Sequence, residues 1–266
     1  MSQILTLTPT MLETYGRCPA QYQARYINRQ RSEEPPSSAL ARGSAAHAVL
    51  RQVFDLFCGT GAFPIDLHAR IAAQLAREPY ATNAEHAADV EAIVGWVHWA
   101  LAEFDGTAQV VAVEQPLEYR YPGSDACPSF RLRAFVDLVL RHDDGSLTVV
   151  DWKTATSCRV DPIPTTVARI VAGQTYGNYR EIRNSTTFLP AKVAVTEVIT
   201  REQGAATWRE IKSLVKAIST DRVWQPISGP LCPYCPLYHR SCALHPKPSD
   251  VDTMRDWLEG MEDAAE

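Results

Sequence analysis

The stretch 130–153, FRLRAFVDLVLRHDDGSLTVVDWK, predicts two strands joined by a tight turn. Apolar and β-branched residues dominate both of its ends, and the segment between them, HDDGS at 142–146, has the composition of a turn. The turn is centred on Asp144, and positions 137 and 151 lie at equal distances from that centre. If the hairpin pairs symmetrically, Asp137 and Asp151 face each other across the two strands.

Two facing carboxylates in an apolar hairpin need a neutralising partner, because like charges placed opposite each other destabilise a sheet. Hard divalent cations such as Mg²⁺ and Mn²⁺ prefer oxygen ligands of this kind. Lys153 follows Asp151 by two residues and therefore shares its face of the strand. Its ammonium group could hold an attacking water or stabilise the charge of a phosphate. The alternative is a simple ion pair between Asp151 and Lys153 at an exposed strand end.

Two residues outside the hairpin could complete such a site. Glu114 lies in the middle of the alternating stretch QVVAVEQPLEYRY, 109–121, which predicts a preceding strand. His47 lies on a predicted helix beside Leu50 and Phe54. Each residue also has an ordinary interpretation, which is a solvent-facing strand residue for Glu114 and a buried, hydrogen-bonded histidine for His47. The pattern alone does not assign either of them to the site.

The remaining chain contains both helical and extended patterns, which is typical of an α/β domain. Helices are expected at 8–30, 43–57, two within 66–104 with a break near Glu78 and Pro79, 165–183 and 208–218. Strands are expected at 109–121, 130–141, 147–153 and 191–199. We therefore expect one domain over 1–250, with a mainly helical part at 1–105, a sheet core at 106–200 and a helix with a cysteine-rich end at 201–246, followed by an acidic tail at 247–266.

The composition is that of an ordinary globular protein, and its formal net charge of −5 does not point to nucleic acid. Phosphate contacts need only a local basic surface, however. One candidate is a run of arginines with no acidic residue between its members, whose ordinary interpretation is a solvated helix face: Arg17, Arg25, Arg29 and Arg31. No apolar stretch approaches the roughly 18 residues that span a bilayer, and the first residues do not resemble a secretory signal. We therefore expect a cytoplasmic protein without a membrane segment.

Seven cysteines in a cytoplasmic chain indicate metal or redox chemistry rather than disulfide bonds. Three of them form the pattern Cys232-x2-Cys235-x6-Cys242, in which the first two thiolates can reach one metal. Zn²⁺ and a 4Fe–4S cluster both require a fourth ligand. The candidates are Cys18, Cys58, Cys127, Cys158, His239 and His245. The spacing predicts a metal site and does not choose between zinc and iron–sulfur.

Taken together and in chain order, these motifs resemble those of a known family. They are Tyr15-x2-Cys18-Pro19, His47, Glu114, Asp137, Asp151-x-Lys153, Gln174 and Cys232-x2-Cys235-x6-Cys242. They resemble the RecB-like branch of the PD-(D/E)XK nuclease superfamily. More closely, they resemble its members with an iron–sulfur clasp, which are the AddB nuclease domain and the small CRISPR-associated spacer-acquisition exonucleases. The resemblance runs from about residue 8 to 245.

The resemblance implies a restriction-endonuclease-like core, in which a central mixed sheet is flanked by helices, with N-terminal helical additions and a C-terminal cysteine-rich clasp. It implies one or two Mg²⁺ or Mn²⁺ ions held by His47, Asp137, Asp151 and the carbonyl of Trp152, with Glu114, Lys153 and Gln174 as further catalytic residues. It also selects Cys18 with Cys232, Cys235 and Cys242 as ligands of a 4Fe–4S cluster, for which Zn²⁺ is the alternative. Cys58, Cys127 and Cys158 are then ordinary residues.

Two positions depart from the family pattern. The family helix after the lysine usually reads Gln-x3-Tyr, whereas Gln174 is followed by Asn178 at the expected place and by Tyr176 and Tyr179 nearby. The small residue three positions before the first aspartate is Ala134 instead of glycine. Gln174 is therefore carried over from the family, and the pattern does not decide which tyrosine takes the family's role.

The function implied by the resemblance is a metal-dependent deoxyribonuclease. We expect an exonuclease acting on single-stranded DNA or on duplex ends, in recombination, repair, phage DNA processing or CRISPR adaptation. Candidate DNA contacts are Arg17, Arg25, Tyr176 and Tyr179. The chain lacks a Gly-x4-Gly-Lys-Ser/Thr loop, so a helicase would be a separate partner, as would a recombination or CRISPR protein. The alternatives are an inactive DNA-binding scaffold of the same fold and a zinc-knuckle binding protein.

Overall fold

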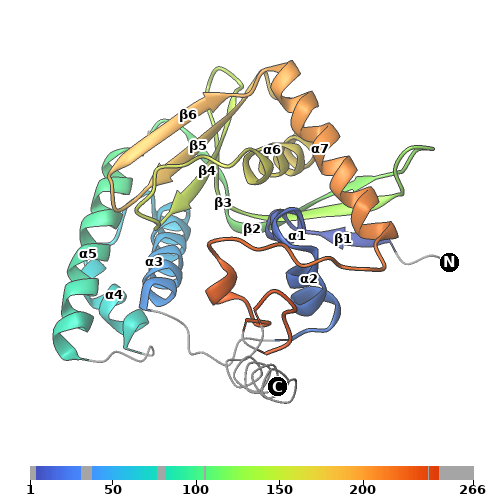
Figure 1. Ribbon diagram of the computed structural model, residues 1–266. Coiled ribbons are helices and arrows are strands. Elements are labelled where there is room, and N and C mark those ends of the chain that lie inside the picture. The colour runs from blue at the N-terminus through green and yellow to red at the C-terminus, as the bar shows by residue number, and fades with distance from the viewer. Residues whose placement is uncertain (1–3, 31–37, 77–81, 105, 239, 246–266) are drawn as a thin grey trace, which may run out of the picture. The chain divides into compact units, whose positions relative to one another are not determined.

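The computed structural model describes residues 4–30, 38–76, 82–104, 106–238 and 240–245 (Figure 1). The chain divides into two compact units. The first comprises 1–9 and 36–211, and the second comprises 10–35 and 212–266. The predicted acidic tail and the predicted break near Glu78 and Pro79 lie outside the described residues. None of the described helices is both long enough and apolar enough to cross a membrane.

A six-stranded mixed sheet forms the centre of the first unit. Its strands are β1 (Leu5–Leu7), β2 (Gln109–Tyr121), β3 (Phe130–Arg141), β4 (Leu147–Lys153), β5 (Ile182–Phe188) and β6 (Val193–Val198). The order is β1-β3-β4-β5-β6, and β2 pairs with β3. Neighbours are antiparallel except for β1 with β3 and β4 with β5, which are parallel. The parallel pair β4–β5 is joined through helix α6 (Pro162–Tyr176), as a crossover connection requires.

The hairpin of β3 and β4 has the predicted register. Leu138 pairs with Val150, and Arg141 pairs with Leu147, so the pairing is symmetric about Asp144. The predicted bounds of β2, β3 and β4 are confirmed. Continued by one residue, this register brings position 137 opposite position 151.

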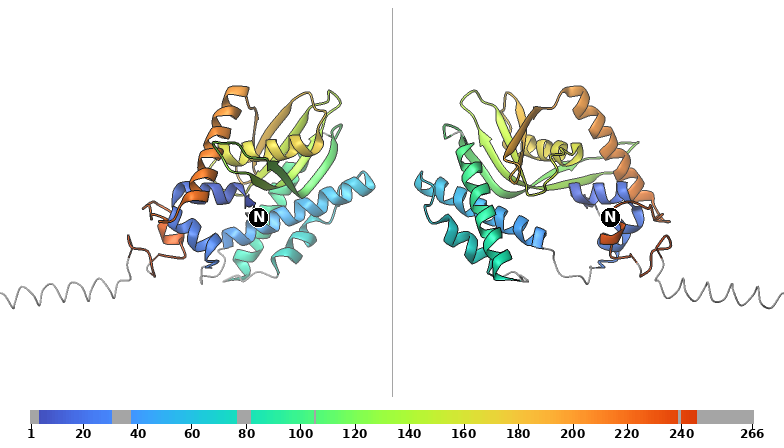
Figure 2. Two further views of the ribbon diagram at one scale, coloured as in Figure 1. Left: turned by 90° about the vertical axis from the view of Figure 1, so that its right-hand side faces the viewer. Right: turned by 60° about the vertical axis from the view of Figure 1, so that its left-hand side comes forward.

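Helices flank the sheet of the first unit. They are α3 (Ser38–Thr60), α4 (Leu67–Leu75), α5 (Asn83–Ala102), α6 and the start of α7 (Arg201–Thr220). Figure 2 shows α3, α4 and α5 packed together, with α6 on the other side of the sheet from α3. A core of buried apolar residues joins α3, α4 and α5 to β3 and β4. In this core the ring of Phe54 stacks on Trp152 at 5.7 Å, which fixes α3 against the strand that carries Asp151.

The second unit has less regular structure. It contains most of α1 (Pro9–Arg17), α2 (Pro19–Tyr22), a π-helical turn (Gln23–Ile27), the end of α7 and a short 3₁₀ turn (Cys232–Tyr234). Aromatic rings form its core: Tyr22 stacks on Trp224 at 5.9 Å and contacts Tyr15 edge-on at 5.5 Å. The hydroxyl of Tyr15 donates to Asp221 at 2.9 Å, and this hydrogen bond links the N-terminal and C-terminal segments that make up the second unit.

Two predicted helices are wrong in part. The helix expected at 8–30 is interrupted at Cys18, whose backbone is extended because Pro19 disfavours the helical conformation of the preceding residue. The helix expected at 165–183 ends at Tyr176, and its last residues belong to β5 instead. The sequence of β5, IRNSTTF, is polar and does not alternate, although most of its side chains are buried. Some of their polar groups are paired: the Asn184 amide N–H donates to the carbonyl of Thr165 at 3.2 Å, and the Thr196 hydroxyl donates to Oγ of Ser185 at 3.1 Å. The buried Oδ1 of Asn184 has no hydrogen-bond partner among the described residues.

Three further expectations need smaller corrections. The helices expected at 43–57 and 208–218 both exist, and each extends further at its two ends, as α3 and α7. The strand expected at 191–199 is the shorter β6. Phe135 belongs to the apolar part of the predicted hairpin, but 62% of it is exposed, and the guanidinium of Arg133 lies 5.5 Å from its ring.

Candidate active site

Three carboxylates lie on three neighbouring strands of the first unit. Val113 pairs with Leu138 and Gln115 pairs with Val136, so the same register places Glu114 of β2 opposite Asp137 of β3. The β3–β4 register places Asp151 on the other side of Asp137. The middle carboxylate therefore has a carboxylate on each flanking strand, an arrangement that concentrates negative charge in the sheet.

The backbone of Glu114 has a positive φ of 43°, although Glu114 is within β2. Residues with a side chain rarely adopt this conformation, which costs on the order of 1–3 kcal/mol and is found most often at functional sites. The strain is retained because the surrounding strand pairs fix the backbone on both sides. The β2–β3 register continues without a shift past Glu114, so the strained backbone lies within a regular strand pair.

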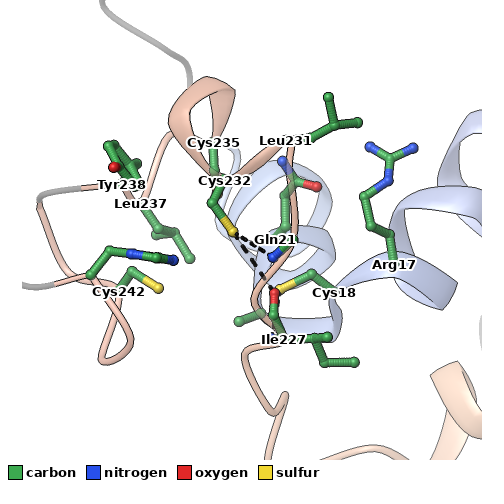
Figure 3. Close-up of a pocket in the computed structure, with 13 residues that line it drawn as sticks. Arg17, Cys18, Gln21, Ile227, Leu231, Cys232, Cys235, Leu237, Tyr238 and Cys242 are labelled. Atoms are coloured by element: carbon green, nitrogen blue, oxygen red, sulfur yellow. Dashed lines mark hydrogen bonds between the residues drawn. The ribbon is translucent and has the colours of Figure 1, made fainter.

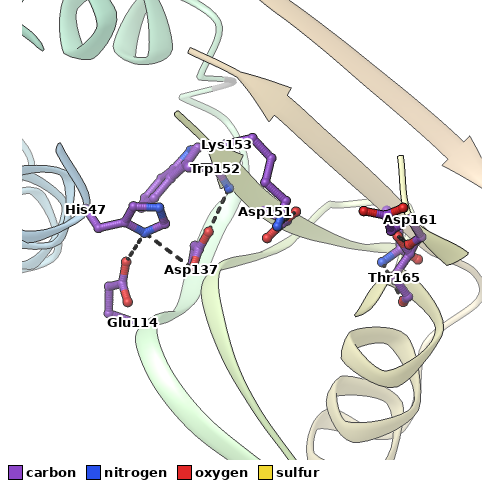
Figure 4. Close-up of polar contacts among 9 residues, drawn as sticks. His47, Glu114, Asp137, Asp151, Trp152, Lys153, Asp161 and Thr165 are labelled. Atoms are coloured by element: carbon purple, nitrogen blue, oxygen red, sulfur yellow. Dashed lines mark hydrogen bonds and ion pairs between the residues drawn. The ribbon is translucent and has the colours of Figure 1, made fainter. Parts of the chain in front are cut away.

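Helix α3 contributes His47 to this group (Figure 4). Its Nδ1 lies 2.8 Å from Oε1 of Glu114 and 3.6 Å from Oδ1 of Asp137. One ligand atom from each of these three residues lies within 4.8 Å of the other two. The edge of the His47 ring contacts Trp152 at 6.1 Å, so the packing of α3 also orients the imidazole. The two carboxylates are oxygen ligands of the kind that Mg²⁺ and Mn²⁺ prefer, whereas the imidazole is a ligand more typical of transition metals.

Asp137 is the most buried member of the group, with 8% of its surface exposed. Its Oδ2 accepts a hydrogen bond of 2.6 Å from the backbone N–H of Trp152, which fixes the carboxylate between the strands (Figure 4). Burial raises the pKa of Asp137, as do the charges of Asp151 and Glu114, while His47 and the Trp152 N–H lower it, and the net result is a pKa of about 7. Near neutral pH the carboxyl group of Asp137 is therefore partly protonated, and a bound cation would displace the proton.

The pKa of His47 is shifted by opposing effects. Burial lowers it, but the hydrogen bond to Glu114 and the charges of Asp137, Glu114 and Asp151 raise it to about 9. The imidazole is therefore a cation at neutral pH when nothing else balances the carboxylates. A metal ion would take the place of this proton on His47.

Asp151 and Lys153 form an ion pair beside the three-residue group. Nζ of Lys153 lies 2.9 Å from Oδ2 of Asp151, and about two fifths of each side chain is exposed, 38% and 40% respectively. Asp151 is not one of the three residues whose ligand atoms converge in the described part of the chain. Its charge nevertheless acts on Asp137 and His47, so it lies close to them. Its expected role as a metal ligand, and that of the Trp152 carbonyl, stay predictions.

Two candidate site residues of α6, Gln174 and Tyr176, lie in different surroundings. The hydroxyl of Tyr176 donates to the side chain of Gln115 at 2.9 Å, next to Glu114 in the chain. Gln174 is exposed and lines a separate cavity together with Tyr179 and Trp208. The side chain of Tyr176 therefore contacts the strand that carries Glu114.

Gly43 is a site-proximal residue that sequence reasoning did not single out. A Cβ added there would lie 2.9 Å from Oγ1 of Thr154, which directly follows Lys153. Gly43 precedes His47 by four residues, so both lie on one face of α3. The absence of a side chain lets that face approach the end of β4. The spacing from Gly43 to His47, one helical turn, was a usable signal.

The cysteines expected to bind a metal lie together in the second unit. Cys18, Cys232, Cys235 and Cys242 line one pocket, and none of them is in a disulfide (Figure 3). The backbone N–H of Ile227 points at Sγ of Cys18 at 3.4 Å, and that of Gly229 points at Sγ of Cys232 at 3.2 Å. Burial raises the pKa of the Cys235 thiol, with smaller effects from residues around the pocket, among them Cys18, Cys242 and Arg25. Four thiols around one space, with N–H groups directed at two sulfurs, are a suitable set of ligands for a metal centre.

Other candidates for the metal in the second unit have different positions. His245 lines the same pocket, and its buried Nε2 has no hydrogen-bond partner among the described residues. His239 lies outside the described residues, as does Arg31. Cys58 and Cys158 are exposed and Cys127 is buried, and none of these three lines the pocket. Arg17 lines it, while Arg25 is close enough for its charge to act on a thiol of the pocket.

Comparisons with known proteins give one family. The model of the PD-(D/E)XK nuclease superfamily matches residues 6–243. Among solved structures, the chain is similar to SSO0001, with 12% identity, 92% of this chain and 88% of that chain covered, and a TM-score of 0.44. It is also similar to a chain named "Putative exonuclease" from Eubacterium rectale, with 8% identity, 86% and 87% coverage, and a TM-score of 0.48. No curated protein matches the chain in sequence.

Proposed function

Because the chain belongs to the PD-(D/E)XK nuclease superfamily, we propose that it hydrolyses phosphodiester bonds of DNA with a divalent metal ion held by His47, Glu114 and Asp137. The observation that carries this proposal is the convergence of these three side chains within 4.8 Å. The two carboxylates suit Mg²⁺ or Mn²⁺, and the pKa of Asp137 is raised by its burial first and by the charges of Asp151 and Glu114 second. We further propose that Asp151 and the carbonyl of Trp152 complete the coordination.

A metal ion bound at this site would polarise the scissile phosphate and acidify a water molecule. Asp151 holds the ammonium group of Lys153 at 2.9 Å, in the exposed part of the site that a substrate can reach. Lys153 can therefore donate a hydrogen bond to the attacking water and orient it, while its charge stabilises the phosphate. The Trp152 N–H fixes Asp137, so the rigid strand pair sets the orientation of the buried carboxylate.

The experiment that tests this proposal is digestion of DNA labelled at either end, with Mg²⁺, with Mn²⁺ and with EDTA. We expect metal-dependent release of short products from single-stranded DNA or from duplex ends, which is the exonuclease activity that the resemblance implies. DNA binding with no cleavage under any metal would favour an inactive scaffold of the same fold and would contradict the proposal.

We also propose that Cys18, Cys232, Cys235 and Cys242 hold a 4Fe–4S cluster that stabilises the second unit. The proposal is supported by the four free thiols around one pocket and by the N–H groups directed at two of their sulfurs. With every ligand supplied by the protein, the cluster has no open position for substrate. Iron, sulfide and zinc analysis of anaerobically purified protein tests it. One zinc and no iron would contradict the cluster and favour a zinc knuckle.

The biological setting follows from the same proposal. Free cysteines suit a reducing compartment, so we propose a cytoplasmic protein. DNA recombination, repair, phage DNA processing or CRISPR adaptation is the proposed process, with a separate helicase, recombination or CRISPR protein as partner. Co-purification of the tagged protein from its native host, with and without nuclease treatment, tests for such a partner.

A further inference from the structure

A cavity of the first unit holds about 430 Å³, and none of the residues of the three-residue group lines it. Residues of β2, α6, the loop after α6 and α7 line it. Its principal side chains are Tyr119, Arg169, Gln174, Tyr179 and Trp208. This volume is in the range of cavities that bind small molecules. The lining contains one cationic side chain and, among the described residues, no carboxylate, so it suits an anionic ligand.

Arg169 is the charged residue of this cavity. Its Nε is buried and has no hydrogen-bond partner in the described part of the chain. A buried donor without a partner costs free energy, and such a group in a folded protein calls for an explanation. An anion in the cavity would supply the missing acceptor. A phosphate group suits a guanidinium best, because it can accept two parallel hydrogen bonds.

Two glycines leave space for the side chains that line this cavity. A Cβ at Gly204 would collide with Nη2 of Arg169, so the guanidinium lies directly over the backbone of α7. A Cβ at Gly173 would lie 3.0 Å from the hydroxyl of Tyr179. Small residues at both positions allow the polar groups to lie along the cavity walls without filling it.

An aromatic wall faces the same space. Tyr119 and Tyr121 contact the ring of Trp208 edge-on, at 5.9 and 5.7 Å, and hold it in place. Trp208 lines the cavity together with Tyr119 and Tyr179. A fixed aromatic ring beside a cation is the combination that binds bases of single-stranded nucleic acid, where the ring stacks on the base and the cation contacts the phosphate.

We propose that this cavity binds one unstacked nucleotide of a single-stranded DNA substrate, with its phosphate on Arg169 and its base on the aromatic wall of Trp208. The proposal deepens the proposed nuclease function and rests on it. A base that is paired and stacked in a duplex cannot enter a cavity, whereas an unpaired one can. The cavity therefore makes single-stranded DNA, or the frayed end of a duplex, the preferred substrate.

The position of the cavity relative to Glu114 follows from β2. Tyr119 follows Glu114 by five residues in the same strand, so the two positions are about 17 Å apart along the backbone. That distance corresponds to about five nucleotides at the stacked spacing of one strand. Side chains five residues apart in a strand point to opposite faces of the sheet, so a DNA strand that reaches both sites must pass around an edge of the sheet. Oligonucleotides of about five residues or fewer therefore reach only one of the two sites.

The test is binding of fluorescent dT20 to the full-length protein in EDTA, which requires no cleavage. Arg169→Ala and Trp208→Ala should each weaken binding by about tenfold. Gly204→Ala should also weaken it, because the new methyl group displaces the guanidinium while every charge is kept. Arg209→Ala removes an exposed arginine of the same helix outside the cavity and serves as the matched control. A 20-base-pair duplex should show no difference between these variants.

Gly204→Ala also separates a loss of DNA binding from a loss of folding. The clash involves the end of a flexible side chain, and alanine is a better helix former than glycine, so this variant should melt no lower than the wild type. If all three cavity variants bind dT20 as tightly as Arg209→Ala does, the inference is overturned. If dT20 binding depends on the cavity but no metal supports cleavage, the cavity stands and the nuclease proposal fails.

Cleavage provides an independent second measurement. In the wild type, KM should fall as oligonucleotides lengthen beyond about five residues, while kcat stays constant. Arg169→Ala should remove most of this fall and leave kcat unchanged. A KM that depends on length equally in Arg169→Ala and in the wild type would overturn the inference even though the protein is a nuclease.

Discussion

The carboxylate site and the cysteine pocket are built in opposite ways. His47, Glu114 and Asp137 lie on a long helix and two paired strands, so their positions are fixed by backbone registers before any ion binds. The four cysteines lie at a helix interruption, in a 3₁₀ turn and in loops. At the carboxylate site, whose geometry exists without the ion, the metal neutralises negative charge. At the cysteine pocket, which lies on irregular backbone, the metal cross-links the chain.

This difference predicts what each metal does. Removing a divalent ion from the carboxylate site should leave the sheet folded, because its core is apolar and continuous. Removing the centre from the cysteine pocket should release loops that have few other regular contacts. In small metal-dependent domains, metal binding and folding are the same event. Substitutions at the carboxylate site should therefore affect catalysis, and substitutions at the cysteine pocket should affect folding.

The largest expected effect is on catalysis. Lys153→Ala should lower the rate of DNA cleavage by about 10²–10⁴-fold, because the group that orients the water and supports the phosphate is lost. DNA binding and the melting temperature should change little, since the side chain is partly exposed. Initial rates on end-labelled DNA with Mn²⁺ measure the effect. Lys216→Ala, an exposed lysine of the second unit, is the control, and equal rates for the two variants would remove Lys153 from the site.

The next effect is on folding of the second unit. Cys232→Ser should remove the visible absorbance of a cluster and reduce the yield of folded protein together, at a cost of several kcal/mol. Iron content and the melting curve are the measurements. Cys158→Ser replaces an exposed cysteine that does not line the pocket and should change neither. A colourless Cys232→Ser protein with normal stability and activity would show that the pocket needs no metal.

A smaller effect is expected where α3 meets the end of β4. Gly43→Ala introduces a Cβ 2.9 Å from Oγ1 of Thr154, so α3 or the residues after Lys153 must shift. A displacement of this size should lower kcat by about 10–100-fold, because catalytic groups tolerate little misplacement. Thr154→Ala in the same chain removes the contacted atom and should restore most of the rate. Failure of this double variant to recover would assign the loss to another cause.

Much of the fold is accessible from the sequence where one local pattern dominates. The bounds of β2, β3 and β4 follow from apolar and β-branched residues between clear turn signals. The symmetric register about Asp144 follows from the short turn, and it locates Asp137 and Asp151 without a structure. The superfamily follows from short motifs in the correct order, and its model matches residues 6–243.

The parts that were missed depend on tertiary context. β5 is polar in sequence, and only its place between β4 and β6 makes it a strand. Cys18 interrupts a continuous helical pattern because Pro19 follows it, and this proline is a local signal that the sequence itself contains. The contact of His47 with Glu114 joins residues 67 positions apart, so no local pattern could place it. The same holds for the close approach of Gly43 to Thr154.

The smallest expected effect is the pH dependence of stability in the metal-free protein. Folding raises the pKa of Asp137 from 3.8 to about 7 and that of His47 from 6.5 to about 9. The folded state therefore binds more protons than the unfolded state between about pH 4 and 9, and stability falls as pH rises through this window. Mg²⁺ replaces these protons, so its stabilising effect should increase with pH. Melting in EDTA and in Mg²⁺ at pH 6 and 8.5 should show a gap that widens by a few degrees at the higher pH. His47→Gln should reduce the EDTA slope between about pH 7 and 9, where the imidazole titrates, and an unchanged slope in that variant would contradict the placement of the imidazole beside the two carboxylates.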